Sequence, residues 1–422
     1  MEKYNFKEYS DRLDNDKFYE NIYNTPWYHD AVYELFSPAE FQRRHDALRQ
    51  AMANRGFDCL IVSGGQSNWS QGGCMTWVSG LIDTRSMAQY VVFPREDEPL
   101  LVYGMGGAHV ELMRRTITPS CQVIVCSRGQ YADVMVQYVK ELGLDKSRIG
   151  ILESIAGNPP EFPPQKQIQT LLSGLPEAQI EFVSGLFHRL AYLKSAEEIE
   201  ARARAGALAV AAFRALVERA KPGMTEHALA AAATRVILAA GGRVDSISIG
   251  STPGDAPSIV SSNPLPSARK LQPGDLILAD ISAGFMGVTA RIANPICVGE
   301  PSAVVKELWQ VAAAGFTRLE SLLHSGTRLD KIAQAGKFFR EQGYQSAPLL
   351  LHGLDIAAST PRVYVHGCEA ESFEQVLQPG MVVVLCPNIV APQGQWGIGI
   401  SRTYAITATG KRCLAEFPVQ MA

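Results

Sequence analysis

The order of helical and extended patterns in the second half of the chain limits its fold more than any other feature. Ser195 is a typical helix N-cap, Glu197 and Glu198 follow in the first turn, and apolar residues then recur at helical spacing. A second helix is predicted from Thr225 to Gly241. Strand patterns follow in DLILADISA and GVTARIANPICVG.

The same order then occurs a second time. SAVVKELWQVAAAGFTRLESLL and RLDKIAQAGKFFREQGY are predicted as a second helix pair, and MVVVLCPNIV and ISRTYAITATG as further strands. Helix pair, strands, helix pair, strands predicts two related halves, in which the helices back a curved antiparallel sheet.

The order of helices and strands is different in the preceding part of the chain. Helices and strands alternate over residues 37–188, beginning with a helix capped by Ser37 and followed by the buried strand FDCLIVSG and the hairpin pair QYVVFP and PLLVYG. Residues 1–36 are polar, charged and aromatic, with no signal-peptide pattern, and are predicted to be an extension that packs on a neighbouring domain or subunit, a frayed tail being the alternative. The predicted fold class is therefore α/β with two domains, 37–188 and 189–422.

Composition supports two globular domains and excludes several classes of partner. The chain has 422 residues, of which 46% are apolar and 19% charged, so it has enough apolar surface for more than one core. A net charge of -3 gives no electrostatic reason to expect nucleic acid or a membrane surface, and no apolar run is long enough to span a bilayer. The eight cysteines are scattered, which is typical of reduced thiols in the cytoplasm.

Six segments in order carry a family resemblance. They are LKSAEEIEARARAG, KPGMTE, LQPGDLILADISAGFMG, the HG at His352, LQPGMVVVLCPNI and YAITATGKRCLAEFP. Together they resemble the family of creatinase, prolidase, aminopeptidase P and methionine aminopeptidase over about residues 38–415. The resemblance implies a C-terminal pita-bread domain behind an N-terminal α/β domain, as in creatinase and prolidase.

The resemblance also implies where a metal site would lie. Metal-dependent members hold two divalent ions with two aspartates, a histidine and two glutamates, which suit hard metals that activate a hydroxide. Carried onto this chain, these positions are Asp280, Arg291, His352, Cys386 and Ser401. Three of the five are not ligands of that kind, and one is a cation. We therefore expect no metal and no other cofactor.

Nearby carboxylates leave one alternative open. Asp275 is expected to cap the turn that enters the strand, and Glu369 and Glu371 lie in a polar loop. Asp355, three residues after His352, can face the cavity. A single-metal site made by Asp280, His352 and Asp355 is therefore the alternative to a metal-free site.

Creatinase, a metal-independent member of the family, offers a second comparison. This chain also lacks the catalytic residues of creatinase. The catalytic histidine there falls on Ser262, and the two glutamates that grip a guanidinium fall on Ala293 and Cys386. We therefore expect a substrate without a guanidinium group. Ectoine hydrolase, and a lyase that acts on a sulfonium zwitterion, are other small-molecule relatives.

The remaining polar residues suggest roles in catalysis. His352 is the candidate acid/base, because imidazole titrates near neutrality, and Asp280 would orient it or act as a base itself. Arg291, with Arg402 as a second candidate, would hold a carboxylate or an oxyanion. Cys386 is a candidate nucleophile if a neighbouring charge lowers its pKa. The alternatives are a His352 that only fills space, an Arg291–Asp280 ion pair that plugs the metal position, and an inert Cys386.

Further contacts to the substrate are assigned to three residues of the C-terminal domain and to one of the N-terminal domain. Asp355, His366 and Ser401 are the first three. Arg85 is the fourth, because in creatinase relatives an arginine of this stretch reaches into the site of the partner subunit. The resemblance thus implies a homodimer with shared active sites. Two tryptophans of the same region, Trp69 and Trp77, either wall the site or lie in the core or the dimer interface.

The sequence therefore predicts a metal-independent, creatinase-like hydrolase that cleaves a C–N bond in a small carboxylate-bearing molecule. A lyase on a small zwitterionic or carboxylate substrate is one alternative. A catalytically inactive binding protein that retains the peptidase fold is another, and a metallopeptidase with rearranged ligands is a third.

Overall fold

A computed structural model of the chain describes residues 34–64, 66–67, 70–71, 73–82, 89–104, 121, 123–127, 129–152, 164–355 and 359–422. The chain divides into two compact units, and the division falls between Ala191 and Tyr192. The sequence patterns place it after residue 188. Almost all of the expected extension over residues 1–36 lies outside the described residues.

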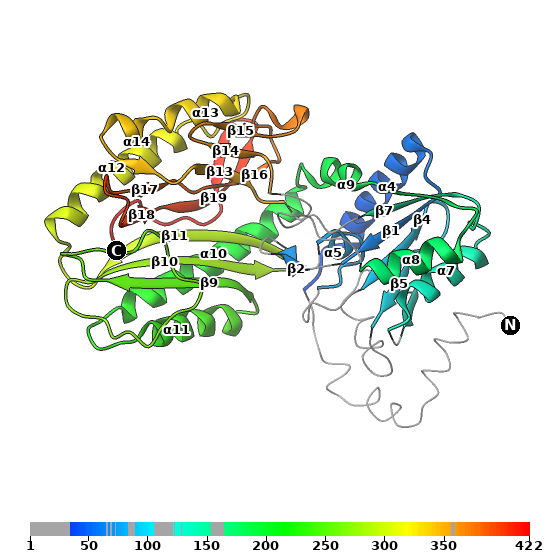
Figure 1. The fold of residues 1–422 in the computed structure, drawn as a ribbon, viewed down its shortest axis with the longest axis horizontal. Coiled ribbons are helices and arrows are strands. Elements are labelled where there is room, and N and C mark those ends of the chain that lie inside the picture. Colours follow the sequence, from blue (N-terminus) through cyan, green and yellow to red (C-terminus); the bar gives the residue numbers. More distant parts are fainter. Residues whose placement is uncertain are drawn as a thin grey trace, which may run out of the picture. The chain divides into compact units, whose positions relative to one another are not determined.

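A six-stranded sheet forms the centre of the first unit (Figure 1). In pairing order its strands are β6 (Val123–Cys126), β5 (Leu100–Tyr103), β4 (Tyr90–Pro94), β1 (Cys59–Ser63), β7 (Arg148–Leu152) and β8 (Gln179–Phe182). Strand β4 is antiparallel to both neighbours, which confirms the predicted β4–β5 hairpin, and the other pairs are parallel. A short hairpin of β2 (Gln66–Ser67) and β3 (Ser70–Gln71) belongs to the same unit.

Helices cover both faces of this sheet. Cys59 and Ile61 of β1 share one apolar cluster with Met135 of α7 (Tyr131–Glu141) and with residues of α8 (Gln165–Gly174). On the other face, the ring of His45 in α4 (Pro38–Arg55) packs edge-on against Phe93, with 5.0 Å between centroids. Helices α5 (Gly73–Ser79) and α9 (Ser184–Ala191) join α4 there. The predicted Ser37 cap is confirmed, because its side chain accepts a hydrogen bond from the backbone N–H of Glu40.

The second unit is built on a long antiparallel sheet. In pairing order its strands are β15 (Gly367–Glu369), β14 (Arg362–Tyr364), β13 (Leu349–Gly353), β16 (Val382–Leu385), β19 (Ser401–Thr407), β11 (Val288–Cys297), β10 (Leu276–Phe285) and β9 (Arg243–Thr252). Strand β20 (Gly410–Cys413) pairs with β19. A separate small sheet consists of β12 (Gln345–Ser346), β17 (Asn388–Val390) and β18 (Gly397–Gly399).

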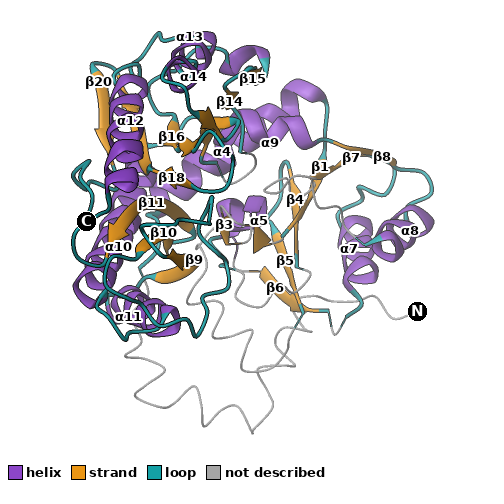
Figure 2. Ribbon diagram, turned by 60° about the vertical axis from the view of Figure 1, so that its left-hand side comes forward, coloured by secondary structure: helices purple, strands orange, loops and turns teal. Residues whose placement is uncertain are grey.

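Two sets of helices back the two halves of the long sheet (Figures 1 and 2). Helices α10 (Ala196–Arg219) and α11 (Glu226–Ala239) share an apolar cluster with β9, β10 and β11. Helices α12 (Ala303–Glu320), α13 (Leu329–Ala335) and α14 (Phe338–Glu341) share another with β13, β16 and β19. The predicted Ser195 cap is confirmed at the start of α10, where Ser195 and Glu198 form a capping box. Among the described residues, no helix combines the length and the apolar character needed to cross a membrane.

One predicted helix is interrupted. The sequence pattern predicts a single helix over residues 328–344, whereas the structure has α13 and α14 with Gly336 between them. A Cβ atom at Gly336 would lie 2.3 Å from the end of the Leu350 side chain, so a larger residue there would require Leu350 to move. This close approach accompanies the break, and the local helix pattern does not reveal it.

The β10–β11 hairpin positions the polar residues that the sequence singled out. Its two-residue turn has positive φ at both positions, 51° at Met286 and 81° at Gly287, which is the geometry that matches the twist of paired strands. The turn fixes a register in which Asp280 lies opposite Ala293. Because alternate residues of β10 pack on α10 and α11, Asp280 points to the other face of the sheet.

Candidate active site

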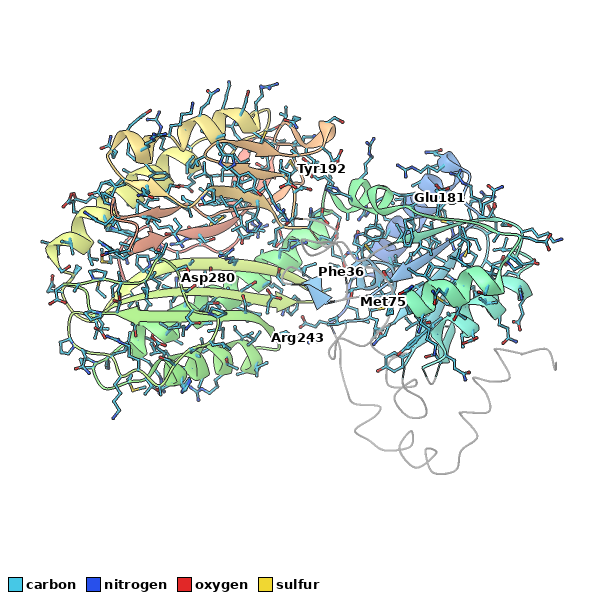
Figure 3. The ribbon with its side chains drawn as sticks, in the orientation of Figure 1. Phe36, Met75, Glu181, Tyr192, Arg243 and Asp280 are labelled. Carbon is cyan, nitrogen blue, oxygen red and sulfur yellow. The ribbon has the colours of Figure 1, made fainter. Side chains whose placement is uncertain are left out.

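A cavity of about 140 Å³ lies on the face of β10 and β11 that is turned away from α10 and α11. Asp280, labelled in Figure 3, lies midway along β10 and forms part of the lining. The other polar side chains of the lining are Ser261, Ser262, Arg291, Cys386, Asn388 and Ser401. All of them belong to the second unit.

Strands β10, β11 and β19 present one row of side chains to the cavity. Asp280 on β10 is opposite Ala293 on β11, and Ala293 is opposite Ser401 on β19. Opposite residues of an antiparallel pair project to the same face, so the small Ala293 separates the carboxylate from the hydroxyl. Cys386 follows β16, the strand beyond β19. The structure thus brings together Asp280, Arg291, Cys386 and Ser401, four of the five positions that the family resemblance implied.

Arg291 and Asp280 form a close two-pronged ion pair. Arg291 Nε donates to Asp280 Oδ1 at 2.8 Å and to Oδ2 at 3.0 Å, and Nη2 donates to Oδ2. Burial opposes the positive charge and lowers the pKa of Arg291, but the charge of Asp280 and the hydrogen bonds to it raise the pKa above its usual value overall. The guanidinium is therefore permanently charged and fixed against the cavity wall.

Two hydrogen bonds to the Thr403 hydroxyl fix the backbone of Arg291. The backbone N–H of Arg291 donates to Thr403 Oγ1 at 2.8 Å, and Thr403 Oγ1 donates to the carbonyl oxygen of Arg291 at 3.0 Å. Thr403 lies on β19, two residues after Ser401. This contact joins β11 to β19 beyond the point where their ladder ends, and it holds Arg291 opposite Thr403.

The residues at the family's metal positions do not fit a dinuclear centre. Both carboxylate oxygens of Asp280 accept hydrogen bonds from Arg291, whose positive charge would repel a divalent ion. Within the described ranges, no group of three or more His, Cys, Asp or Glu side chains is arranged to hold a metal ion. Asp355, which the single-metal alternative requires, pairs with Lys194.

Asp355 forms a buried ion pair that lies apart from the cavity lining. Lys194 Nζ donates to Asp355 Oδ2 at 2.8 Å and to the carbonyl oxygen of Tyr192, and both charged side chains are almost fully buried. Burial lowers the pKa of Lys194, and the charge of Asp355 counteracts that effect. The predicted role of Asp355 in substrate binding stays a prediction, although its contacts here connect the start of the unit to the segment after β13.

His352 lies on β13, and it is buried and absent from the cavity lining. Its Nδ1 donates to the carbonyl oxygen of Gly353 at 2.9 Å, which assigns Nε2 as the acceptor nitrogen. Burial and the positive charges of Arg291 and Arg362 lower the pKa of His352 to about 3. At neutral pH the imidazole is therefore uncharged and is a proton acceptor rather than a donor.

Cys386 has the opposite electrostatic balance from the one that activates a thiol. Burial raises its pKa to about 11, and Asp280 adds to this, while the attraction of Arg291 only partly compensates. A thiol with this pKa carries its proton at neutral pH. The condition that we set for a cysteine nucleophile, a pKa lowered by a neighbouring charge, is not met in this state of the protein.

The other predicted contacts lie elsewhere in the described structure or outside it. His366 is exposed between β14 and β15 and stacks on Tyr364, with 5.3 Å between ring centroids. Arg402, the second arginine candidate, is buried and donates to carbonyl oxygens, including that of Ala293 at 2.8 Å. Arg85 lies outside the described residues, so the shared-site homodimer stays a prediction.

The two tryptophans of the first unit complete the predicted contacts. Trp77 is buried and packs edge-on against Phe187, with 4.9 Å between ring centroids. This packing agrees with the core alternative. Trp69 lies outside the described residues.

Two polar residues near the site were missed by the sequence reasoning. Asn388 lines the cavity, and only its position just after Cys386 gave a signal. Asp245 on β9 is adjacent to Ser282 and Arg291, and burial raises its pKa to about 7 against the lowering effect of both neighbours. The pairing register shifts beside Asp245, so β9 has one extra residue there. The sequence did contain a signal for Asp245. It is an aspartate at the two-residue spacing of the core residues Ile247 and Ile249, where a buried apolar residue would be expected.

The chain is similar to enzymes of one family in sequence and in structure. The family model described as metallopeptidase family M24 matches residues 200–408. A creatinase from Bacillus sp. (strain B-0618) is 23% identical over 92% of this chain and 93% of its own length. An ectoine hydrolase from Halomonas elongata is 24% identical over 92% of this chain and 98% of its own.

Solved structures show the same fold at low identity. An X-Pro aminopeptidase from Thermotoga maritima superposes with a TM-score of 0.72 at 19% identity, over 89% of this chain and 98% of that one. A prolidase from Pyrococcus horikoshii superposes with a TM-score of 0.70 at 19% identity, over 90% of this chain and 100% of that one. The predicted fold class, with its pita-bread second unit, is confirmed.

Proposed function

Since the chain belongs to metallopeptidase family M24, in the group of creatinase and prolidase, we propose that it is a hydrolase that cleaves a C–N bond in a small carboxylate-bearing molecule without divalent metal ions. Two relatives that align with nearly the whole chain are named creatinase and ectoine hydrolase. These names support a small substrate for this chain as well.

The Arg291–Asp280 ion pair at the cavity wall is the observation that carries the proposal. A guanidinium stands where a metal-dependent relative would place an acidic ligand, so positive charge is supplied by the protein itself. Such a group can hold a substrate carboxylate or stabilise the oxyanion that forms when water adds to a carbonyl carbon. Both roles fit a hydrolase that needs no ion.

The size of the cavity supports a small substrate. A cavity of about 150 Å³ holds a molecule the size of benzene, and this one measures about 140 Å³. Even the smallest dipeptide that ends in proline has about twice as many non-hydrogen atoms as benzene. The cavity therefore favours a compact molecule over the peptides named for the prolidase relatives.

Hydrolysis also needs a proton acceptor. Water must add to the carbon of the C–N bond while it loses a proton, and the leaving nitrogen must gain one. Asp280 lines the cavity and can take the proton from water, although its pairing with Arg291 weakens it as a base. His352 is neutral and presents an acceptor nitrogen, but it does not line the cavity. We therefore assign direct contact with water to Asp280 and retain His352 as the predicted second proton carrier.

The experiment combines metal analysis with turnover. The purified full chain is dialysed against a chelator, analysed for Mn, Fe, Co and Zn, and assayed with small amides and with dipeptides in H₂¹⁸O. We expect no stoichiometric transition-metal ion in the protein. We also expect cleavage of a small amide that chelators do not inhibit, with ¹⁸O in the acid product. Metal-dependent cleavage of dipeptides would contradict the proposal. Cleavage without ¹⁸O incorporation would support the lyase alternative, and binding without turnover would support the inactive binding protein.

A further inference from the structure

The cavity lining also contains the amide side chain of Asn388, which no part of the proposed mechanism uses. Asn388 begins β17 and pairs with Gly399 on β18, and both residues line the cavity. A Cβ atom at the nearby Gly397 would lie 3.1 Å from Asn388 Oδ1 and 2.5 Å from the carbonyl oxygen of Ile389. The small sheet therefore leaves space for the amide of Asn388.

The orientation of this amide is determined by one hydrogen bond. Asn388 Nδ2 donates to the carbonyl oxygen of Val260 at 3.0 Å, and because a carbonyl can only accept, the nitrogen must face Val260. Oδ1 then has a fixed position. That atom is buried and has no hydrogen-bond partner among the residues that the structure describes. An amide oxygen can only accept, so its complement is an N–H or O–H group.

A second buried polar atom belongs to another residue that lines the same cavity. Ser401 is 2% exposed, and its Oγ has no hydrogen-bond partner within the described chain. Its place in the row with Asp280 and Ala293 puts it on the face that the cavity occupies. Buried polar groups in folded proteins are normally hydrogen-bonded, and these two atoms belong to residues that line one cavity, which points to a ligand that satisfies them.

We propose that Asn388 and Ser401 form a recognition wall for an N–H group of the substrate, with Asn388 Oδ1 as the acceptor that determines specificity. Arg291 lines the same cavity and supplies the positive charge for a carboxylate. The substrate class is then a small acid with an amide or amine N–H close to its carboxylate, of which N-acyl amino acids are the simplest members. This inference rests on the proposed function and specifies its substrate.

Two molecules of the same shape test the acceptor directly. N-acetylglycine and acetoxyacetate have the same number of heavy atoms and the same carboxylate, and they differ only in an amide N–H against an ester oxygen. Equilibrium binding of each to the full chain is measured by ligand-detected NMR at low temperature, before appreciable turnover. We expect wild type to bind N-acetylglycine at least about tenfold more tightly, because the ester leaves the buried acceptor unsatisfied.

The variants assign this preference to the wall. Asn388→Leu should reduce the ratio of the two dissociation constants to about one, and Ser401→Ala should reduce it in part. Gln345→Leu is the matched control, because Gln345 also donates its amide to a backbone carbonyl, that of Pro392, but is exposed and absent from the lining. The control should keep the wild-type ratio.

Gly399→Ala gives a second route if Asn388→Leu does not fold. A Cβ atom at Gly399 would meet Asn388 only at 3.7–3.9 Å, so the chain can accept it, yet the methyl group narrows the cavity beside the amide. It should weaken the binding of both probes. Equal affinity of wild type for both probes, no binding of N-acetylglycine, or an unchanged ratio in Asn388→Leu would each overturn the recognition wall. Turnover is not part of this readout, so a chain that binds with the expected ratio but does not hydrolyse contradicts only the proposed function.

Discussion

Arg291 and Asp280 meet diagonally across the β10–β11 hairpin rather than face to face. Asp280 is opposite Ala293, and Arg291 is opposite Ser282, so each long charged side chain has a small partner across the ladder. Diagonal neighbours in an antiparallel pair are within reach of long side chains. The two small residues leave the guanidinium free to lie along the sheet and take both carboxylate oxygens. The ion pair thus occupies two of the positions that the family resemblance assigned to metal ligands.

Restoring the acidic ligands should restore metal binding only when all of them are present. Arg291→Asp alone should bind no stoichiometric ion, because Cys386 and Ser401 still supply neutral groups. The triple change Arg291→Asp, Cys386→Glu and Ser401→Glu should bind Mn²⁺ or Co²⁺ in calorimetric titrations. The double change without Arg291→Asp is the matched control. Stoichiometric metal in Arg291→Asp alone would show that the remaining residues suffice.

Local sequence patterns were enough to predict much of the fold and part of the site. The caps at Ser37 and Ser195 are local hydrogen bonds within one helix turn, so their signal is complete in a few residues. The convergence of Asp280, Cys386 and Ser401 follows from strand order, which the family resemblance supplied. These features depend either on neighbours in the chain or on a known topology.

The remaining features depend on contacts that no local pattern contains. Lys194 gave no sign that it pairs with Asp355, because 161 residues separate them. At the break between α13 and α14, Gly336 lies close to Leu350 of β13. The bulge at Asp245 interrupts the two-residue alternation that includes Ile247, and it depends on pairing with β10. In each case the partner that decides the outcome lies on another element.

Asp245 should make the protein less stable as the pH rises toward neutrality. Its pKa of about 7 lies above the usual value of 3.8, so the folded state holds the proton more tightly than the unfolded state. This contribution to the unfolding free energy is complete below pH 3.8 and is lost as the pH rises to about 7, at up to about 1.4 kcal/mol per unit. Asp245→Asn should remove the loss.

Chemical denaturation at a series of pH values measures this effect. The difference between Asp245→Asn and wild type should grow in favour of the variant from pH 4 to pH 7 and stay constant above it. Asp330→Asn is a suitable control, because Asp330 is exposed and pairs with Arg328 at the surface. A difference that does not change with pH would mean that Asp245 is charged throughout.

Cys386 should react slowly with alkylating reagents at neutral pH. Its pKa of about 11 leaves very little thiolate, and the side chain is only partly exposed. Cys368 is exposed and provides an internal comparison within the same molecule. Iodoacetamide at pH 7 followed by peptide mass spectrometry should show Cys368 modified first. Preferential labelling of Cys386 would instead favour the thiol nucleophile.

His352 should have the opposite effect on stability from Asp245. Its pKa of about 3 lies below the usual value of 6.5, because burial and the charges of Arg291 and Arg362 disfavour the imidazolium. The contribution of neutral His352 is complete above pH 6.5 and is lost as the pH falls toward 3, again at up to about 1.4 kcal/mol per unit. His352→Gln should therefore be less sensitive to acid than wild type in the same denaturation series.

Turnover then tests whether His352 also transfers a proton. If it is the second proton carrier, His352→Gln should lower kcat by about 10²-fold or more at pH 7, even where denaturation shows the variant to be folded. Asp280→Asn should lower kcat as well, with an added loss of stability because Arg291 loses its partner. His227→Gln is the matched histidine control and should keep wild-type turnover, because His227 is exposed on α11 and absent from the cavity lining. Full activity in His352→Gln together with an inactive Asp280→Asn would leave Asp280 as the proton acceptor and His352 as a buried packing residue.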